Sequence, residues 1–273
     1  MNETPDELKT ALVLPGGGAR GAFQVGVLKA LAELLPRASS NPFPIVSGTS
    51  AGAVNAVVLA TRARKYRSAV AELERVWGHF RCNQVYKTDH LTMLKSSLHW
   101  LAALVLGGWL VGMPRSLLDN SPLRRLLSRN VHFPRIRDAI EAGHLDAVAI
   151  TAAGYASARS ISFFEAHPGH AGWERTRRMG QAAELSLEHL MASIAVPYVF
   201  PPARIGNEWF GDGAMRQATP LSPAVRLGAD RILVIGIRDE MGGAEPDNAA
   251  EPPSFAQIAG YMLDTLFMDG LYS

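Results

Sequence analysis

The stretch FPIVSGTSAGAVNAVVLA, residues 43–60, contains the pattern that decides the fold. Its first part, Phe43–Val46, is an apolar run. The small residues Gly48-Thr49-Ser50-Ala51-Gly52 follow, and Ala53–Ala60 is predicted to form an apolar helix. A strand, a tight turn and a helix form the setting of a nucleophile elbow, which presents its serine at the carboxyl edge of a sheet. Because Gly-x-Ser-x-Gly also occurs by chance, a structural serine in a glycine-rich turn is the alternative to a nucleophilic Ser50.

The segment before this stretch has the same plan. A buried strand is predicted at Ala11–Leu14, followed by Gly16-Gly17-Gly18-Ala19-Arg20-Gly21 and by a helix with apolar residues at helical spacing over Gly21–Leu35. Strand, turn and helix therefore occur twice in succession. This repetition predicts an α/β fold with a parallel sheet.

Three interpretations fit the glycine loop at residues 16–21. A dinucleotide site of a nicotinamide-dependent oxidoreductase would use Gly16, Gly18 and Gly21, but it needs an acidic residue after the next strand. Ile45–Gly48 offers none. An oxyanion hole would use the amides of Gly16–Gly18 beside the elbow, where each donor contributes about 3–4 kcal/mol. The oxyanion hole is favoured, and a purely structural loop is the third interpretation.

The rest of the chain extends the alternation of strands and helices. Further strands are predicted at Leu145–Thr151, Ser160–Phe164 and Arg231–Ile237, a hairpin over Ala203–Phe210, and helices at Ala69–Phe80, Leu187–Ala195, Pro223–Leu227 and Phe255–Met268. We expect one catalytic domain over residues 1–239 and a linker or mobile loop over 240–253. Residues 254–273 are expected to form a C-terminal helix that begins a longer region.

A nucleophilic serine needs a base, and Asp212 is the best candidate. It lies between Gly211 and Gly213, which give the backbone room for a sharp turn that presents the carboxylate. The last of the eight histidines, His189, precedes Asp212, so the order serine, acid, histidine of α/β-hydrolases is excluded with this acid. An aspartate is ionised at neutral pH but is a weak base, so partial desolvation must assist it. A hairpin turn is the alternative, since Asp-Gly is a common turn pair.

Composition narrows the class of protein. The chain has 273 residues, is 48% hydrophobic and carries a net charge of +2, so it can bury a core but gives no reason to expect nucleic acid as partner. Its one cysteine, Cys82, excludes a disulfide framework. The polar, acidic start lacks the features of a signal peptide, so a cytoplasmic location is expected, with delivery by a route that reads no such signal left open.

One uncharged stretch, with Leu98–Met113 at its centre, raises the question of a membrane. It is flanked by Lys95 and Arg115 and only just reaches the roughly 20 residues that span a bilayer. A transmembrane helix, a buried core or cap helix, and a lid that meets lipid are the three alternatives. Basic clusters that suit anionic headgroups or ordinary solvated faces are Arg62, Arg64, Lys65 and Arg67; Arg124, Arg125 and Arg129; and Arg175, Arg177 and Arg178.

Taken together, the ordered motifs resemble the patatin-like phospholipase family. The blocks are Gly16–Gly21, Gly48–Gly52, Asp212–Ala214, and Ala192–Pro197 running into Phe200-Pro201-Pro202, so the resemblance covers Thr10 to Ile237. It implies a three-layer α/β/α sandwich with a mainly parallel central sheet. The residues expected to support the motifs are Arg20, Gly21, Gly48, Gly52, Gly213 and Ala214.

The resemblance also implies a chemistry. It makes Ser50 the nucleophile, Asp212 its base and Gly16–Gly18 the oxyanion hole of a lipid acyl hydrolase that needs no metal and no cofactor. The expected partner is a lipid substrate, with peripheral membrane contact through Leu98–Met113 and the basic clusters. A non-catalytic lipid-binding module is the alternative of a different class. The sequence indicates neither the lipid headgroup nor the oligomeric state.

Overall fold

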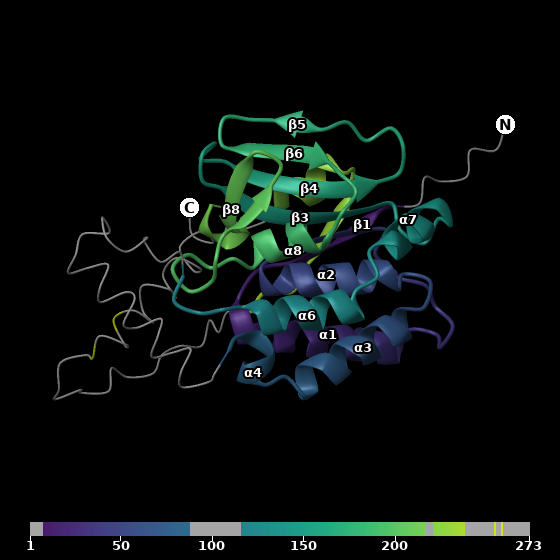
Figure 1. Cartoon of the computed structure of the whole chain (residues 1–273). Coiled ribbons are helices and arrows are strands. Elements are labelled where there is room, and N and C mark those ends of the chain that lie inside the picture. Colours follow the sequence, from purple (N-terminus) through teal and green to yellow (C-terminus); the bar gives the residue numbers. More distant parts are fainter. Residues whose placement is uncertain (1–7, 88–115, 217–220, 238–253, 255–257, 259–273) are drawn as a thin grey trace, which may run out of the picture.

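The computed structural model describes residues 8–87, 116–216 and 221–237, together with Ser254 and Ile258. A mixed β-sheet runs through the centre (Figure 1). Its parallel half consists of β9 (Arg231–Val234), β1 (Thr10–Leu14), β2 (Ile45–Thr49) and β3 (Ala147–Gly154), in that spatial order. The two strand–turn–helix units predicted from the sequence are neighbours in this half, which brings the turn after β1 beside the turn after β2.

The other half of the sheet is antiparallel at its start. β4 (Ser160–Ala166) runs antiparallel to β3, β6 (Arg178–Ala182) is parallel to β4, and β5 (Trp173–Glu174) completes the edge. The sequence prediction omitted β5 and β6. Both are short and mostly exposed, so neither has the apolar alternation that identifies a half-buried strand.

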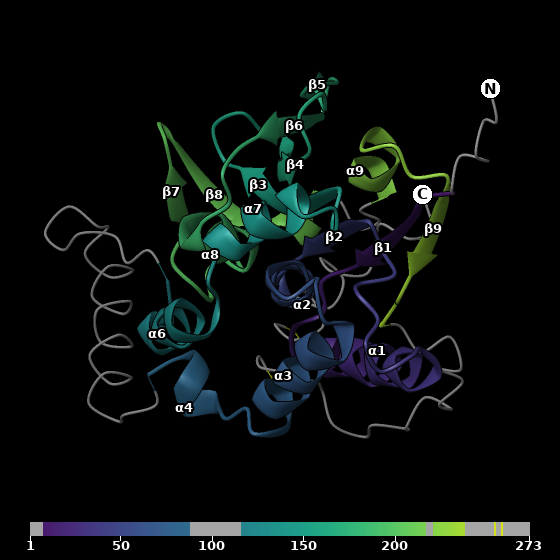
Figure 2. The same ribbon diagram turned by 90° about the vertical axis from the view of Figure 1, so that its right-hand side faces the viewer.

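Helices cover both faces of the sheet, which confirms the predicted α/β/α class (Figure 2). The helices on the larger side are α1 (Gly21–Leu34), α2 (Ala51–Thr61), α3 (Tyr66–Gly78), α4 (Cys82–Val85), α6 (Ser121–Asn130), α7 (Pro134–Glu141) and α8 (Leu187–Ser193). α9 (Leu221–Arg226) covers the opposite face. Alternation along β1 divides the core, because Leu12 and Leu14 pack among the larger group of helices whereas Ala11 and Val13 pack on the side of α9.

Several boundaries differ from the sequence prediction for physical reasons. β2 continues to Thr49, three residues beyond the predicted end at Val46, because Ser47 and Thr49 are buried and paired with β3 although they are polar. α6 and α7 were not predicted, since charged residues are at least as numerous as aliphatic ones in both. The predicted segments Leu98–Met113, 240–253 and Phe255–Met268 lie outside the described residues, apart from Ile258. Within the described ranges, no helix has the length and apolar character needed to cross a membrane.

Candidate active site

Two strands approach each other head-on along one edge of β3. β2 runs parallel to β3 and ends with Thr49 opposite Thr151. β8 (Glu208–Asp212) runs antiparallel to β3 and ends with Asp212 opposite Ala152, the next residue of β3. Because the two registers are consecutive, the residue that follows β2, Ser50, and the last residue of β8 meet at the same point of the sheet.

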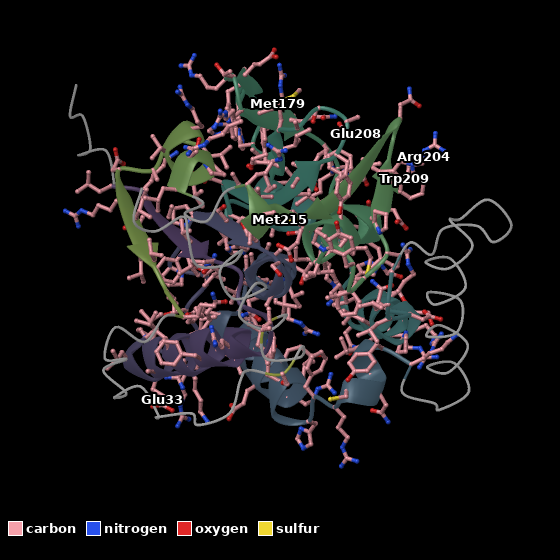
Figure 3. The ribbon with its side chains drawn as sticks, turned by 90° about the vertical axis from the view of Figure 1, so that its left-hand side faces the viewer. Glu33, Met179, Arg204, Glu208, Trp209 and Met215 are labelled. Carbon is pink, nitrogen blue, oxygen red and sulfur yellow. The ribbon has the colours of Figure 1, made fainter. Side chains whose placement is uncertain are left out.

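The predicted hairpin delivers Asp212 to this point. β7 (Ala203–Ile205) pairs antiparallel with β8, and the connecting turn contains Gly206 with a positive φ of 57°. In Figure 3, Arg204 and Trp209 lie on the outer side of the hairpin. Met215, which comes shortly after Asp212, lies near the middle of the molecule in the same view. The hairpin therefore reaches from the surface into the interior and ends at the carboxylate.

Ser50 has the strained backbone of an elbow. Its φ of 54° and ψ of −126° lie outside the regions that non-glycine residues usually adopt, and it directly precedes α2. Small neighbours are required here, because a Cβ atom on Gly48 would lie 2.4 Å from the carbonyl oxygen of Gly52. A Cβ atom on Gly52 would lie only 2.0 Å from the carbonyl oxygen of Leu14. The predicted motif glycines thus allow β1, β2 and α2 to approach closely behind Ser50.

Asp212 is fully buried, and only one of its oxygens is occupied. Oδ1 accepts a hydrogen bond from the Ala214 N–H at 2.9 Å, whereas Oδ2 has no hydrogen-bond partner among the described residues. Burial raises the pKa of Asp212 to about 7, and the Ser50 hydroxyl and the Ala214 N–H oppose this rise because they stabilise the charged form. The Ser50 hydroxyl is close enough to influence this pKa but does not reach standard hydrogen-bond geometry, a common state before substrate binds.

The glycine loop after β1 lies against Ser50. A Cβ atom on Gly16 would lie 2.9 Å from the Cβ atom of Ser50, and Gly18 has a positive φ of 56°. Among the described residues, the Gly16 and Gly17 amides donate no backbone hydrogen bond. Arg20 is exposed and ends the short 3-10 helix η1 (Gly18–Arg20), which leads into α1.

Motif residues on the other side of Ser50 keep the two halves of the site close. A Cβ atom on Gly213 would lie 2.2 Å from the Thr151 carbonyl oxygen, and one on Gly21 would lie 3.1 Å from the Cβ atom of Ala51. Ala214 is buried and lies near Gly16, where an added Cβ atom would approach it to 3.4 Å. The small residues of three separate sequence blocks therefore pack around one serine.

The fourth block, Ala192–Pro197, holds both halves of the site in place. The Ser50 N–H donates to the Ser193 hydroxyl at 2.9 Å, and that hydroxyl donates to the Thr151 carbonyl at 2.7 Å. Two residues on, the Ala195 carbonyl accepts the Asp212 N–H at 2.8 Å. The family resemblance included this block, and its place among the motifs is the signal that could have identified Ser193, for which no role was predicted.

A buried polar chain fixes the glycine loop from behind. The Gln24 side chain donates to the Pro15 carbonyl at 2.9 Å, and the Asn55 side chain donates to Gln24 at 2.9 Å. The Trp77 indole N–H in turn donates to Asn55 at 2.8 Å. Because Gln24 and Asn55 are fully buried, these bonds are shielded from water and tie the loop to α1, α2 and α3. No sequence pattern predicted this chain of contacts.

An apolar cavity of about 410 Å³ extends from Ser50 between α2, α3, α4 and α6. Its lining is almost wholly apolar and includes Val54 and Val58 of α2, Trp77 of α3 and Leu127 of α6. Phe200, beyond the fourth motif block, adds an aromatic wall. Cavities of this size and character hold apolar ligands, and this one has the serine hydroxyl at its edge.

Other candidate groups have structural partners. His189 is buried against Phe163, its Nδ1 accepts from the Ser186 N–H at 3.1 Å, and burial lowers its pKa. Within the described segments, no group of three or more His, Cys, Asp or Glu side chains is arranged to hold a metal ion. Some members of the basic clusters are engaged within the protein, since Arg124 pairs with Glu188 at 2.5 Å.

Comparison with known proteins places this site in context. A family model described as patatin-like phospholipase matches residues 12–225. The cGAMP-activated phospholipase of Pseudomonas aeruginosa strain BWHPSA011 / Pa011 is 28% identical over 204 residues, which make up 75% of this chain and 52% of that protein. The chain thus spans about half the length of this curated relative.

Two solved structures share a distant likeness. VipD from Legionella pneumophila is 15% identical, with a TM-score of 0.45 over 77% of this chain and 46% of its own. The heterodimeric complex of ExoU and SpcU from the type III secretion system of Pseudomonas aeruginosa gives 15% identity and a TM-score of 0.36 over 95% and 50%. Both likenesses are too distant to bear on the site.

Proposed function

Because the chain belongs to the patatin-like phospholipase family, we propose that it is a serine acyl hydrolase that cleaves fatty-acyl ester bonds of phospholipids or related lipids. The observation that supports this proposal most is the meeting of Ser50 and Asp212 at consecutive positions along β3. A serine and a buried carboxylate, beside a glycine loop and an apolar cavity, supply the groups that ester hydrolysis needs.

In the acylation step, Oγ of Ser50 bonds to the ester carbonyl carbon while its proton passes to Asp212. Oδ2 is the oxygen suited to receive this proton, since Oδ1 already accepts from Ala214. The carbonyl oxygen becomes negatively charged, and the amides of Gly16–Gly18 are the proposed donors to it. When the carbonyl re-forms, the alcohol leaves with the proton from Asp212, and the acyl group stays on Ser50.

The deacylation step reverses these roles with water. Asp212 takes one proton from a water molecule whose oxygen bonds to the acyl carbon. The Ser50 oxygen then leaves and recovers that proton, and the fatty acid is released. A group with a pKa near 7 suits both directions of transfer at neutral pH, and burial raises the pKa of Asp212 to about 7.

Contact with a lipid surface remains part of this proposal. Arg125 and Arg129 are exposed on α6, which lines the cavity, and Arg64 and Lys65 are exposed between α2 and α3. Arg175, Arg177 and Arg178 form a further exposed group at the β5–β6 edge. Each basic residue near an anionic bilayer surface contributes about 1 kcal/mol, so cosedimentation with vesicles that contain or lack anionic lipid tests this contact.

The decisive experiment uses Ser50→Ala with a matched control three residues away. Ser47→Ala removes a buried hydroxyl of β2, the strand that leads to Ser50, and this hydroxyl has no hydrogen-bond partner among the described residues. We expect Ser50→Ala to abolish hydrolysis of a short-chain ester and labelling by a fluorophosphonate probe, with the melting temperature preserved. Ser47→Ala should keep both activities. Full activity in Ser50→Ala, or a label that mass spectrometry locates on another residue, would refute the assignment.

A further inference from the structure

The apolar cavity beside Ser50 has polar side chains at the end opposite the serine. Ser50 lies at one end, where α2 begins. Along the cavity, Val54 and Val58 line it at successive turns of α2, and the lining does not extend to Arg62, one turn further. The lining also includes Glu72 of α3 and Asn130 of α6, and the ion pair between Glu72 and Arg62 places Glu72 near the end of α2.

The depth of the cavity follows from the helix that forms its wall. From Ser50 to Val58 the chain advances eight residues, which at a rise of about 1.5 Å per residue is about 12 Å. An extended carbon chain with tetrahedral angles and bonds of about 1.5 Å advances about 1.25 Å per bond. The cavity therefore accommodates an extended acyl chain of about ten carbon atoms.

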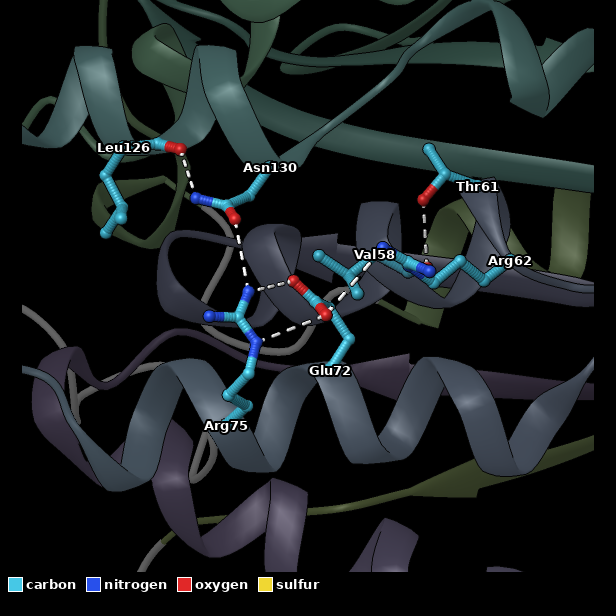
Figure 4. A network of polar contacts seen from close by, with 7 residues as sticks. All are labelled: Val58, Thr61, Arg62, Glu72, Arg75, Leu126 and Asn130. Atoms are coloured by element: carbon cyan, nitrogen blue, oxygen red, sulfur yellow. Dashed lines mark hydrogen bonds and ion pairs between the residues drawn. The ribbon is translucent and has the colours of Figure 1, made fainter.

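Three polar side chains, Glu72, Arg75 and Asn130, form one connected network (Figure 4). Glu72 and Asn130 line the cavity, and the more exposed Arg75 links them from outside its lining. The Arg75 guanidinium binds Glu72 at 2.5 Å and donates to Oδ1 of Asn130 at 3.3 Å. Asn130 is itself held by a 2.7 Å hydrogen bond to the Leu126 carbonyl. The Arg62 guanidinium approaches Glu72 to 3.8 Å from the end of α2.

This bridge connects two helices that the cavity otherwise separates. Arg75 belongs to α3 and Asn130 is the last residue of α6, so their contact joins opposite walls. An apolar chain that advanced past Val58 would meet the Glu72 carboxylate and the Asn130 amide, both of which are bound to the Arg75 guanidinium. It would either strip water from these groups or break their mutual contacts, and both are unfavourable.

We propose that the Glu72–Arg75–Asn130 bridge is the stop that limits the length of the acyl group this protein accepts. The inference rests on the proposed acyl hydrolase function and adds a substrate class to it: esters of medium-chain acids, up to about ten carbon atoms. Below the stop, each added methylene is buried against apolar walls and raises kcat/KM by up to about fourfold. Methylenes beyond the bridge give no further increase in kcat/KM.

The test compares p-nitrophenyl esters from butanoate to hexadecanoate, all presented in the same mixed micelles. Asn130→Ala removes the α6 end of the bridge, and Arg75→Met removes the guanidinium but keeps an apolar stem. Ser128→Ala is the matched control, because Ser128 is exposed on the same helix, does not line the cavity and donates to the Arg125 carbonyl of its own helix. The measured quantity is the ratio of kcat/KM for tetradecanoate to that for decanoate.

We expect a wild-type ratio well below one, and a ratio at least tenfold higher in Asn130→Ala and Arg75→Met. Ser128→Ala should keep the wild-type ratio. Val58→Phe should move the preference toward shorter chains, because the added ring fills the cavity before the bridge is reached. If the melting curve shows that one of the two bridge variants does not fold, the ratio measured for the other variant decides the test.

The outcomes separate this inference from the function on which it rests. A wild-type profile that rises through hexadecanoate, or ratios in both bridge variants within twofold of wild type, would overturn the stop while leaving the hydrolase intact. No hydrolysis of any ester by the wild-type protein would overturn the proposed function itself.

Discussion

Replacing Asp212 with asparagine tests whether the site holds a desolvated carboxylate. Burial raises the pKa of Asp212 in the folded protein to about 7, from an ordinary value of 3.8. Asparagine has a similar shape and keeps an oxygen that can accept the Ala214 N–H, but it has no proton to lose. The variant therefore removes the ionisation and little else.

The size and sign of the effect follow from the two pKa values. The folded protein binds more protons than the unfolded chain between about pH 4 and 7, so the free energy of unfolding falls as pH rises through this window. With a difference of about three pKa units, the full loss is about 4 kcal/mol, of which about 2 to 3 kcal/mol falls between pH 5 and 8. Asp212→Asn escapes this loss.

The assay is urea unfolding of the wild-type protein and Asp212→Asn at pH 5 and pH 8. The difference between the two proteins at each pH cancels other titrating groups, such as Glu165, whose pKa is raised by burial, and His189. We expect the advantage of Asp212→Asn to grow by about 2 to 3 kcal/mol from pH 5 to pH 8, with acyl hydrolysis lost at both.

Asp138→Asn is the control, because Asp138 is exposed on α7 and its replacement should change stability by less than about 0.5 kcal/mol at either pH. An Asp212→Asn advantage that does not vary with pH would refute the reasoning. It would mean that Asp212 ionises as easily in the folded protein as in the unfolded chain.

Three further predictions follow from the site. The wild-type kcat/KM for a soluble ester should fall as pH drops through about 7, because Asp212 must be ionised to accept a proton, and a pH–rate profile checks this. Ser193→Ala should lower kcat about tenfold with an intact fold, since the buried Ser50 N–H loses its acceptor; steady-state kinetics beside a melting curve separate this from unfolding. Gly52→Ala should destabilise the protein by about 3 kcal/mol in urea unfolding, because its Cβ atom would lie 2.0 Å from the Leu14 carbonyl oxygen.

The parts of the fold that sequence alone predicted are those with strong local patterns. β1, α1 and α2 combine apolar runs with glycine-rich turns, and the structure has all three close to the predicted positions. The parallel arrangement also followed, because strand–turn–helix units in succession usually pack as neighbours in a parallel sheet, with their turns at the same edge. The roles of Ser50 and Asp212 remain proposals, although the structure brings the two residues together.

The parts that sequence could not predict depend on contacts between distant segments. Ser193 and Ser50 are 143 positions apart. The sequence around each residue does not indicate that the Ser193 hydroxyl accepts a hydrogen bond from the Ser50 N–H. The same holds for Gln24 and Asn55, which look like ordinary helix residues until their helices pack. The cavity needs four helices to form, and α6 among them was hidden in the sequence by its three arginines.

The head-on meeting of β2 and β8 on β3 has a consequence for biosynthesis. As the chain leaves the ribosome, the elbow with Ser50 emerges early, whereas the carboxylate belongs to a hairpin made 160 residues later. Docking of that hairpin is therefore the event that completes the proposed reaction centre. If Ser50 and Asp212 perform the proposed reaction, copies that lack residues 208–212 cannot hydrolyse esters, and activity starts only after this late segment has been made.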